Sequence, residues 1–277
     1  MASDALAKPK KFIDVEQVIA SKSPRLLKFL PGFIIRYLKK IIHEDELNWG
    51  LNEFGHKQGV EFIDEVLKYF QVSYTVEGLD NLNVDERYIF ASNHPLGGLD
   101  GMILIHSISN KFSDVKVPSN DLLMNIKQLQ DNFIPVNKHG SQTRENARIM
   151  DETYASDTQM FIFPAGLCSR KQGGKIEDLE WKKSFIAKAT KHKRPVVPVF
   201  FSGRNSNFFY NLSRIRTFLG IKVNLEMLYL VDEMFKQRGQ KPHIVIGEPI
   251  PYETFDGSRT PQEWAKWVKA RVYELSK

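Results

Sequence analysis

The sequence is poor in cysteine and has no strong excess of charge of either sign. Cys168 is the single cysteine among 277 residues, so no disulfide can form within the chain and no zinc-finger spacing is possible. Lysine and arginine number 39 against 33 acidic residues, which gives a net charge of +6. This surplus suits an anionic membrane surface, but it is too small to indicate a nucleic-acid partner. A reducing, cytoplasmic environment is expected.

Long hydrophobic runs are also missing. The most apolar stretch, residues 26–42, contains four basic residues and is interrupted by Pro31 and Gly32, whereas a helix that crosses a membrane needs about 20 apolar residues in a row. The first 11 residues lack the apolar core of a secretory signal. Hydrophobic residues make up 42% of the chain and charged residues 26%, which excludes a disordered or fibrous protein.

Short apolar runs alternate with longer segments of helical spacing, and this alternation predicts an α/β fold. The expected strands are residues 72–76, 88–92, 132–136, 160–163, 196–201 and 243–246. Three of them are almost entirely apolar, as in a mostly parallel sheet flanked by helices. The last helix has the clearest start, because Thr260 and Glu263 form a capping box and Pro261 takes the first helical position. We expect an N-terminal amphipathic helical segment over residues 1–71 and an α/β domain over residues 72–277.

Three unusual segments follow predicted strands: residues 93–100 (Asn-His-Pro-Leu-Gly-Gly-Leu-Asp), 164–170 (Pro-Ala-Gly-Leu-Cys-Ser-Arg) and 202–205 (Ser-Gly-Arg-Asn). In an open α/β sheet, sites lie beyond the carboxyl ends of the strands. If the strands are parallel, the three segments converge on one edge of the sheet. This edge is the predicted functional site.

The first of these segments contains residues suited to proton transfer. A neutral His94 can take a proton from a hydroxyl, and Asp100, brought back by the turn, can hold the other ring nitrogen. Gly97 and Gly98 allow a tight turn and a close approach of substrate. No serine or cysteine in this segment can act as nucleophile, so the attacking hydroxyl would belong to a substrate. A structural interpretation stays open, because a histidine at a strand end is often only a hydrogen-bonding residue.

An alternative is a nucleophile within the chain itself. Cys168 is the candidate, since it follows a predicted strand. The Gly-x-Ser/Cys-x-Gly pattern of a nucleophile elbow is missing around it. A small packed residue is therefore the favoured interpretation.

A series of segments resembles the lysophospholipid acyltransferase family, of the 1-acylglycerol-3-phosphate type. Residues 93–100 resemble its histidine–aspartate block, and residues 163–169 resemble its Phe-Pro-Glu-Gly-Thr-Arg-Ser block. Residues 133–138, 181–184, 195–199 and 247–250 are similar to further blocks, in family order. The resemblance covers residues 72–250.

Three departures concern the site. Five residues separate His94 from Asp100, where the family commonly has four. Ala165 replaces a glutamate, and Cys168 replaces an arginine that binds the acceptor phosphate. Arg170, Lys171 or Lys138 would then supply that charge, or the acceptor is not a phosphate. The pattern is most similar to the haemolysin-like bacterial branch that esterifies lyso-ornithine or lyso-glycine lipids, whose carboxylate a lysine or arginine can hold.

The resemblance implies an O-acyltransferase. His94 would take the proton of the acceptor hydroxyl, Asp100 would orient His94, and the hydroxyl would attack the thioester of acyl-ACP or acyl-CoA. Backbone amides around Gly166 and Leu167 would stabilise the oxyanion. The thioester is a co-substrate, and neither a metal nor a redox cofactor is expected. The expected substrate-binding residues are Asn93, Gly97, Gly98, Lys138, Pro164, Gly166, Leu167, Ser169, Arg170 and Lys171.

The N-terminal segment predicts contact with a membrane. Residues 25–42 combine apolar side chains with five basic ones, a composition that suits a pair of helices lying in the interface of an anionic membrane. The same helices could pack on the α/β domain, and both can hold together. The stretch 204–218 is either the border of an acyl groove or only surface loop and core. The expected location is cytoplasmic, peripheral to the inner face of the plasma membrane.

Two other functions stay open. Ala165 and Cys168 also fit a non-catalytic lipid-binding relative, and a thioesterase or other hydrolase would use water in place of the lipid acceptor. A nucleic-acid module is not expected, because the basic residues are not gathered near aromatic stacking positions.

Overall fold

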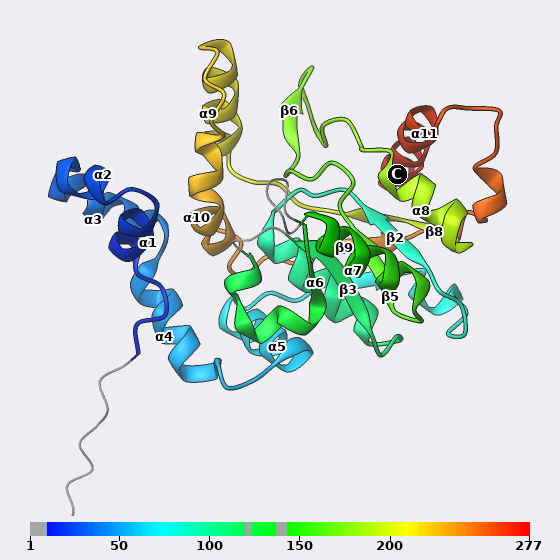
Figure 1. The fold of residues 1–277 in the computed structure, drawn as a ribbon, viewed down its shortest axis with the longest axis horizontal. Coiled ribbons are helices and arrows are strands. Elements are labelled where there is room, and N and C mark those ends of the chain that lie inside the picture. The colour runs from blue at the N-terminus through cyan, green and yellow to red at the C-terminus, as the bar shows by residue number, and fades with distance from the viewer. Residues whose placement is uncertain (1–9, 120–122, 137–142) are drawn as a thin grey trace, which may run out of the picture.

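The computed structural model describes residues 10–119, 123–136 and 143–277. A seven-stranded sheet in the order β1-β9-β8-β2-β5-β3-β4 forms its centre (Figure 1). Every neighbouring pair is parallel except β8 and β9, which are antiparallel. The predicted α/β fold with a mostly parallel sheet is therefore confirmed. The strands of this sheet are β1 (Thr75–Glu77), β2 (Ile89–Ser92), β3 (Val115–Ser119), β4 (Phe133–Pro135), β5 (Gln159–Ile162), β8 (Val196–Phe201) and β9 (His243–Ile246).

Helices precede, connect and cover these strands. The chain begins with α1 (Val15–Lys22), α2 (Pro24–Phe29), α3 (Gly32–Ile41), α4 (Glu44–Phe54) and α5 (Gly59–Tyr69). The later α-helices are α6 (Gly98–Ser109), α7 (Thr143–Ala155), α8 (Ser184–His192), α9 (Asn207–Phe218), α10 (Leu230–Phe235) and α11 (Pro261–Glu274). Short 3₁₀ turns are η1 (Leu79–Asn81), η2 (Leu123–Asn125), η3 (Lys127–Asn132), η4 (Leu225–Tyr229) and η5 (Tyr252–Thr254), and a separate hairpin consists of β6 (Arg170–Gln172) and β7 (Lys175–Glu177).

The central strands are buried on both faces, as their continuous apolar sequences predict. In β2, Phe90 joins the core formed with α5 and α6, whereas Ile89 and Ala91 join the core formed with α7, α8 and α11. Successive side chains of a strand point to opposite faces, so a strand between two helical layers must be apolar throughout. Helix α5 belongs to the first of these cores although it precedes residue 72.

Several predicted boundaries differ from the structure. Strand β3 was not expected, because Lys116 and Pro118 interrupt its apolar residues and only alternate positions are buried. Strand β1 begins at Thr75 rather than at Val72, because the N–H of Val72 still bonds to the carbonyl of Leu67 at the end of α5. The apolar spacing of residues 180–192 predicts a helix over that whole range, but helix α8 begins only at Ser184. The capping box between Thr260 and Glu263 is confirmed at the start of α11.

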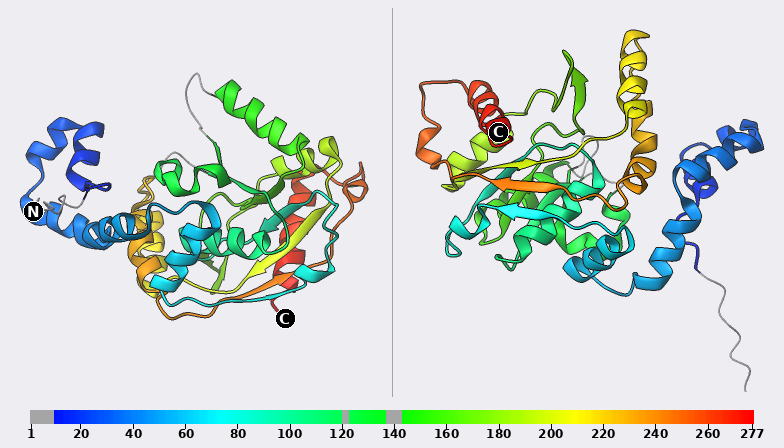
Figure 2. Two further views of the ribbon diagram at one scale, coloured as in Figure 1. Left: turned by 90° about the horizontal axis from the view of Figure 1, so that it is seen from below. Right: turned by 180° about the vertical axis from the view of Figure 1, so that it is seen from behind.

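The N-terminal helices lie at one side of the sheet (Figure 2). The predicted pair of helices is confirmed, since α2 ends at Phe29 and α3 begins at Gly32. Contact with the α/β body runs through α10 and η4, where His43 stacks on Phe235 with ring centroids 3.8 Å apart. No helix in the described ranges has both the length and the apolar composition that crossing a membrane requires.

A buried arginine joins α7 to the strands. Arg194 is fully buried, and its guanidinium donates to the carbonyls of Tyr154 (2.8 Å), Thr158 (2.6 Å) and Ser156. Two of these carbonyls lie at or just beyond the end of α7, where helix geometry leaves carbonyls without partners. The carbonyls of the buried residues Tyr154 and Thr158 depend on this side chain, whereas the carbonyl of Ser156, an exposed residue, also accepts from Arg87.

We expect Arg194→Met to lower the free energy of unfolding by about 3 kcal/mol, because the carbonyls of the buried residues Tyr154 and Thr158 lose their donor at once. Urea denaturation followed by circular dichroism measures this difference. Arg148→Met is the matched control on α7, and its 57% exposed side chain predicts a change of at most about 0.5 kcal/mol. Equal midpoints for wild type and Arg194→Met would contradict the assignment.

Candidate active site

Parallel pairing brings the ends of β2, β5 and β8 to one edge of the sheet. The segment after β2 (residues 93–100, the His94 loop) and the segment after β5 (residues 163–170, the Gly166 loop) meet there, where the N–H of Ser169 donates to the carbonyl of His94 at 2.7 Å. The carboxamide of Asn93 exchanges hydrogen bonds of 2.9 and 2.7 Å with the backbone of Phe201 at the end of β8. The three segments expected to converge do so.

His94 and Asp100 form a hydrogen-bonded pair. Nδ1 of His94 lies 3.0 Å from Oδ1 and 3.1 Å from Oδ2 of Asp100. Asp100 is fully buried in the first turn of α6 and also accepts from the N–H groups of Leu96 (2.8 Å) and Gly97 (3.2 Å). Gly97 has a φ of 91°, a conformation that glycine adopts readily. The loop therefore accommodates five residues between histidine and aspartate and still closes the pair.

The surroundings of His94 favour its protonated form. Burial of the imidazole works against the charge, but the carboxylate of Asp100 and, at longer range, that of Asp178 outweigh this effect and raise the pKa of His94. The ring is 16% exposed and stacks on Phe163 with centroids 3.7 Å apart. Because Asp100 occupies Nδ1, Nε2 is the nitrogen that can exchange a proton with a substrate.

A second buried carboxylate, Asp178, joins the two loops. Its Oδ1 accepts from the backbone N–H of His94 (3.1 Å) and from the hydroxyl of Ser169 (2.6 Å), and its Oδ2 accepts from the indole of Trp181 (2.9 Å). Burial raises the pKa of Asp178, although these hydrogen bonds oppose the rise. Asp178 is thus a positioning residue for the backbone of His94. No motif marked it in the sequence, since its partners lie up to 84 residues away.

The Gly166 loop forms a tight turn beside this pair. The N–H of Gly166 donates to the carbonyl of Phe163 at 2.9 Å, and the carbonyl of Pro164 accepts from the N–H of Lys182 at 3.0 Å. Gly166 has a φ of 66° and lies directly beneath the ammonium of Lys182, which a Cβ atom at residue 166 would approach to 2.9 Å. The loop therefore presents its backbone next to an exposed cation.

Arg170 and Cys168 are both directed into the interior. Arg170 is buried, and its guanidinium pairs with Glu226 at 3.0 Å and donates to the carbonyl of Cys168 at 2.6 Å. Glu226 is fully buried and also binds Arg216. Cys168 is buried, and its burial raises the pKa of the thiol to about 12. The thiol is therefore neutral at physiological pH, unlike the thiolate of a nucleophilic cysteine.

The remaining residues that the sequence predicts to bind substrate do not share one environment. Gly98 is the first residue of α6, and a Cβ atom there would meet nothing within 4 Å. Lys171 is exposed on β6, and Leu167 is half-buried. Lys138 lies outside the described residues. Lys182 belongs to a segment that resembles the family, but its place above Gly166 became apparent only from the fold.

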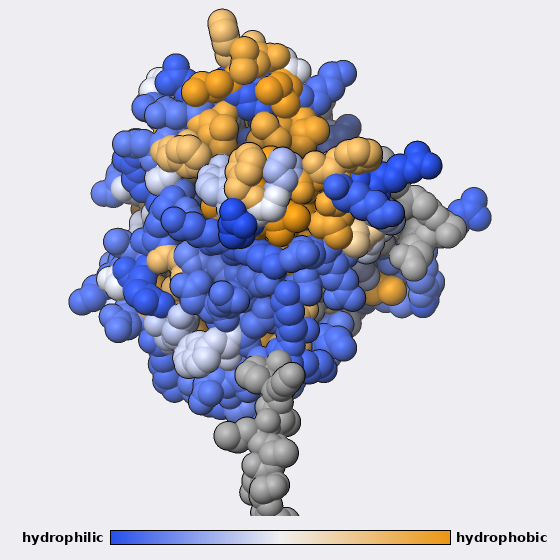
Figure 3. Space-filling view, turned by 90° about the vertical axis from the view of Figure 1, so that its left-hand side faces the viewer, coloured by the Kyte–Doolittle hydropathy of each residue, from blue (hydrophilic) through white to orange (hydrophobic). Residues whose placement is uncertain are grey.

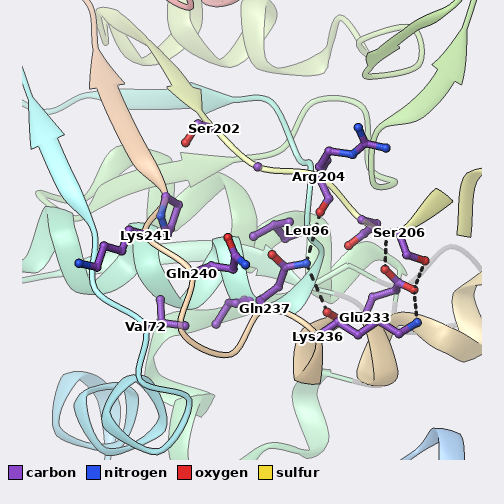
Figure 4. A pocket seen from close by; sticks show the side chains of 14 residues that line it. Val72, Leu96, Ser202, Arg204, Ser206, Glu233, Lys236, Gln237, Gln240 and Lys241 are labelled. Carbon is purple, nitrogen blue, oxygen red and sulfur yellow. Dashed lines mark hydrogen bonds and ion pairs between the residues drawn. The ribbon is translucent and has the colours of Figure 1, made fainter.

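Two cavities lie near these loops, and His94 lines neither of them. One, of about 390 Å³, lies beyond the end of β8, and Leu96 is among the residues that line it (Figure 4). Its polar groups largely bond to one another: Glu233 accepts from Ser206 and Lys236, and Gln237 donates to the carbonyl of Arg204. The other, a groove of about 850 Å³, runs along α9 and the β6–β7 hairpin and includes Leu167.

Within the described ranges, no cluster of three or more histidine, cysteine, aspartate or glutamate side chains is placed to hold a metal ion. What the two loops offer is a histidine with an oriented ring, a carboxylate behind it and a turn with exposed backbone. An arrangement of this kind is chemically suited to activate a hydroxyl group for attack.

Comparison with known proteins identifies the family. The family model described as "Acyltransferase" matches residues 17–277, and the chain belongs to that family. It is therefore an enzyme that transfers acyl groups, and the rival interpretation as a non-catalytic relative is not supported.

Two relatives carry a more specific name. A lyso-glycine lipid O-acyltransferase of Bacteroides thetaiotaomicron is 48% identical over 264 residues, which cover 95% of this chain and 97% of the relative. The protein of the same name from Phocaeicola vulgatus is 46% identical over 264 residues, with 95% of each chain covered. Among solved structures, the 1-acyl-sn-glycerophosphate acyltransferase PlsC of Thermotoga maritima has a TM-score of 0.50 at 19% identity and covers 94% of this chain and 93% of its own. The last likeness concerns the fold.

We expect kcat/KM for acyl transfer to rise with pH through the pKa of His94, because the imidazole must lose its proton before it can act as a base. Since that pKa is raised, the acid limb should lie above the ordinary histidine value of about 6.5. Asp100→Asn removes the main charge that raises it, so the limb should move to lower pH while the maximal rate falls about 10²-fold.

Asp85→Asn, in an exposed loop at the other edge of the sheet, is the control and should leave the profile unchanged. A limb that stays in place in Asp100→Asn would contradict the assigned roles.

Proposed function

We propose that this chain moves a fatty acyl group from acyl-ACP or acyl-CoA to the hydroxyl of a lyso-lipid, and that the acceptor is a lyso-amino-acid lipid of the lyso-glycine type. The observation that carries the proposal is the His94–Asp100 pair without an activated nucleophile beside it. The thiol of Cys168 is kept neutral by burial, and the hydroxyl of Ser169 donates to Asp178. The names of the two relatives that are 46–48% identical support the acceptor class.

The reaction follows from this geometry. Nε2 of His94 takes the proton of the acceptor hydroxyl, and Asp100 stabilises the resulting imidazolium through Nδ1. The hydroxyl oxygen forms a bond to the thioester carbonyl carbon, and the carbon–sulfur bond then breaks. The proton on His94 passes to the leaving thiolate. His94 thus loses the proton that it gained, and the enzyme ends the cycle unchanged.

Backbone amides of the Gly166 loop are the proposed oxyanion donors. The N–H of Gly166 is already used by the carbonyl of Phe163. The N–H of Leu167 has no acceptor within the described residues, so it is the better donor for the charge that develops on the thioester oxygen.

Lys182 is the proposed partner of the acceptor headgroup. The family's phosphate-binding arginine is replaced by Cys168, and Arg170 is held in the interior by Glu226. Lys182 is exposed, contacts Gly166 and has no carboxylate partner in the part of the chain that the structure describes. A single lysine ammonium can pair with the carboxylate of an amino-acid lipid as a point charge.

The nature of the substrate also indicates where the enzyme acts. A lyso-lipid resides in a bilayer, and the apolar, basic helices α2 and α3 suit the interface of an anionic membrane. We therefore propose that the enzyme binds to the inner face of the plasma membrane through these helices.

The direct test is acyl transfer by the purified full-length chain. It is incubated with labelled long-chain acyl-ACP or acyl-CoA and with lyso-glycine lipid, lyso-ornithine lipid or lysophosphatidic acid, and the products are identified by lipid mass spectrometry. We expect esterified lyso-glycine lipid, a loss of about 10²-fold or more in His94→Ala, and retained activity in Cys168→Ala.

Each other outcome has a defined meaning. Free fatty acid without esterified lipid would identify a hydrolase, and loss of turnover in Cys168→Ala would identify a thiol nucleophile. Esterified product that forms equally well in His94→Ala would exclude His94 as the general base, and the absence of any product with every acceptor would contradict the proposed substrates. Acylation of lysophosphatidic acid alone would show that the replacement of the arginine does not change the substrate.

We expect Lys182→Ala to raise the KM for lyso-glycine lipid about 10-fold with a smaller effect on kcat, because one charge-assisted hydrogen bond to the headgroup is lost. Lys182→Arg should restore most of the affinity. Lys183→Ala is the matched control, since Lys183 is the exposed neighbour at the start of α8. An unchanged KM in Lys182→Ala would exclude this role.

A further inference from the structure

The end of helix α9 exposes an unusual concentration of apolar side chains. The residues 218–223, here called the α9 tip, include Phe218 (90% exposed), Leu219 (61%) and Val223 (68%). Most of the large apolar side chains that are exposed in the described residues lie either on α2 and α3 or between residues 208 and 228. Single exposed apolar residues are ordinary on protein surfaces, but a contiguous group marks a contact site.

The same two regions are basic at their surface. Residues 17–43 contain six lysines and arginines and no acidic residue, and residues 207–228 contain three with one acidic residue, Glu226, which is fully buried and pairs with Arg216. The whole chain has a net charge of only +6, so the remainder is net acidic. Apolar side chains among cations are complementary to an anionic lipid surface.

The two regions are continuous in space. The hydroxyl of Tyr37 on α3 lies 2.8 Å from that of Tyr229 at the end of η4, and the ring of Phe208 on α9 packs against Tyr229 with centroids 4.9 Å apart. Figure 3 shows apolar side chains gathered in the upper half of the face where α2, α3 and α9 lie. A flat surface can therefore contact both regions together.

The groove beside α9 links this surface to the active site. Its lining extends from Leu167 in the Gly166 loop to Phe218 at the α9 tip, and includes Leu179 and Ile215. The lining also contains Lys171, Arg214 and Arg216. A lipid that leaves a bilayer at the tip would therefore meet both apolar and basic side chains along a path to the Gly166 loop.

We propose that the α9 tip is a second membrane-binding element, which inserts into an anionic bilayer beside α2 and α3. This element holds the groove open toward the lipid. The inference goes beyond the proposed function, because binding to a bilayer requires neither the acyl donor nor turnover.

The test is the sedimentation of the full-length chain with vesicles of phosphatidylglycerol and phosphatidylcholine, without any acyl donor. We expect Leu219→Ser combined with Val223→Ser to weaken vesicle binding at least about 10-fold, because two apolar side chains no longer enter the membrane. Lys222→Gln should weaken binding to anionic vesicles about fivefold and leave binding to pure phosphatidylcholine unchanged. Val84→Ser removes an equally exposed apolar side chain far from this surface and is the control.

Acyl transfer to an acceptor in detergent micelles is measured in parallel, and the double variant should match wild type there. Unchanged vesicle binding in the double variant would overturn the inference, as would a double variant that differs from wild type in oligomeric state without lipid, which would identify a contact between copies. If wild type shows no acyl transfer but the double variant loses vesicle binding, the proposed function fails and the membrane element stands.

Discussion

The candidate active site depends on the hydrogen bonds that Asp178 makes between two loops far apart in the sequence. Asp178 holds the backbone of His94, the hydroxyl of Ser169 and the indole of Trp181, and so fixes the histidine relative to the loop that presents Gly166. A general base acts only within hydrogen-bond reach of the proton it takes. The carboxylate that orients the ring, Asp100, can do so only because the backbone of His94 is already in place.

The sheet supplies the other constraint. Parallel pairing of β2 with β5 and β8 aligns the ends of three strands, and polar loops can be concentrated there because the strands themselves are apolar and rigid. The buried charged side chains have a different role from the exposed ones. Arg170 and Glu226 stabilise the packing of η4 against the Gly166 loop, whereas Lys182 remains outside and available to a ligand.

Much of this could be predicted from local sequence. The buried strands are continuous apolar runs, and His94, Asp100 and the glycines between them lie in one short segment after such a run. The hairpin β6–β7 could not be predicted in this way, because its residues are mainly polar and no core side chain marks it. The positions of Asp178 and Arg170 could not be predicted either. Their burial depends on His94 and Glu226, which are 84 and 56 residues away, and a charged residue in a sequence is normally exposed.

The antiparallel return of β9 has a consequence for how this fold can vary. The N–H of Ser202 bonds to the carbonyl of His243, and the N–H of His243 bonds to the hydroxyl of Ser202, so the chain leaves and re-enters the sheet at one point. The 41-residue separation between them contains α9, η4 and α10, which together form a closed excursion. Because its two ends are already joined, its length can change without altering any strand pairing, whereas Glu226 in η4 is tied to Arg170. The exposed part of this excursion is therefore a replaceable module, and the loops that carry His94 and Gly166 belong to the fixed frame.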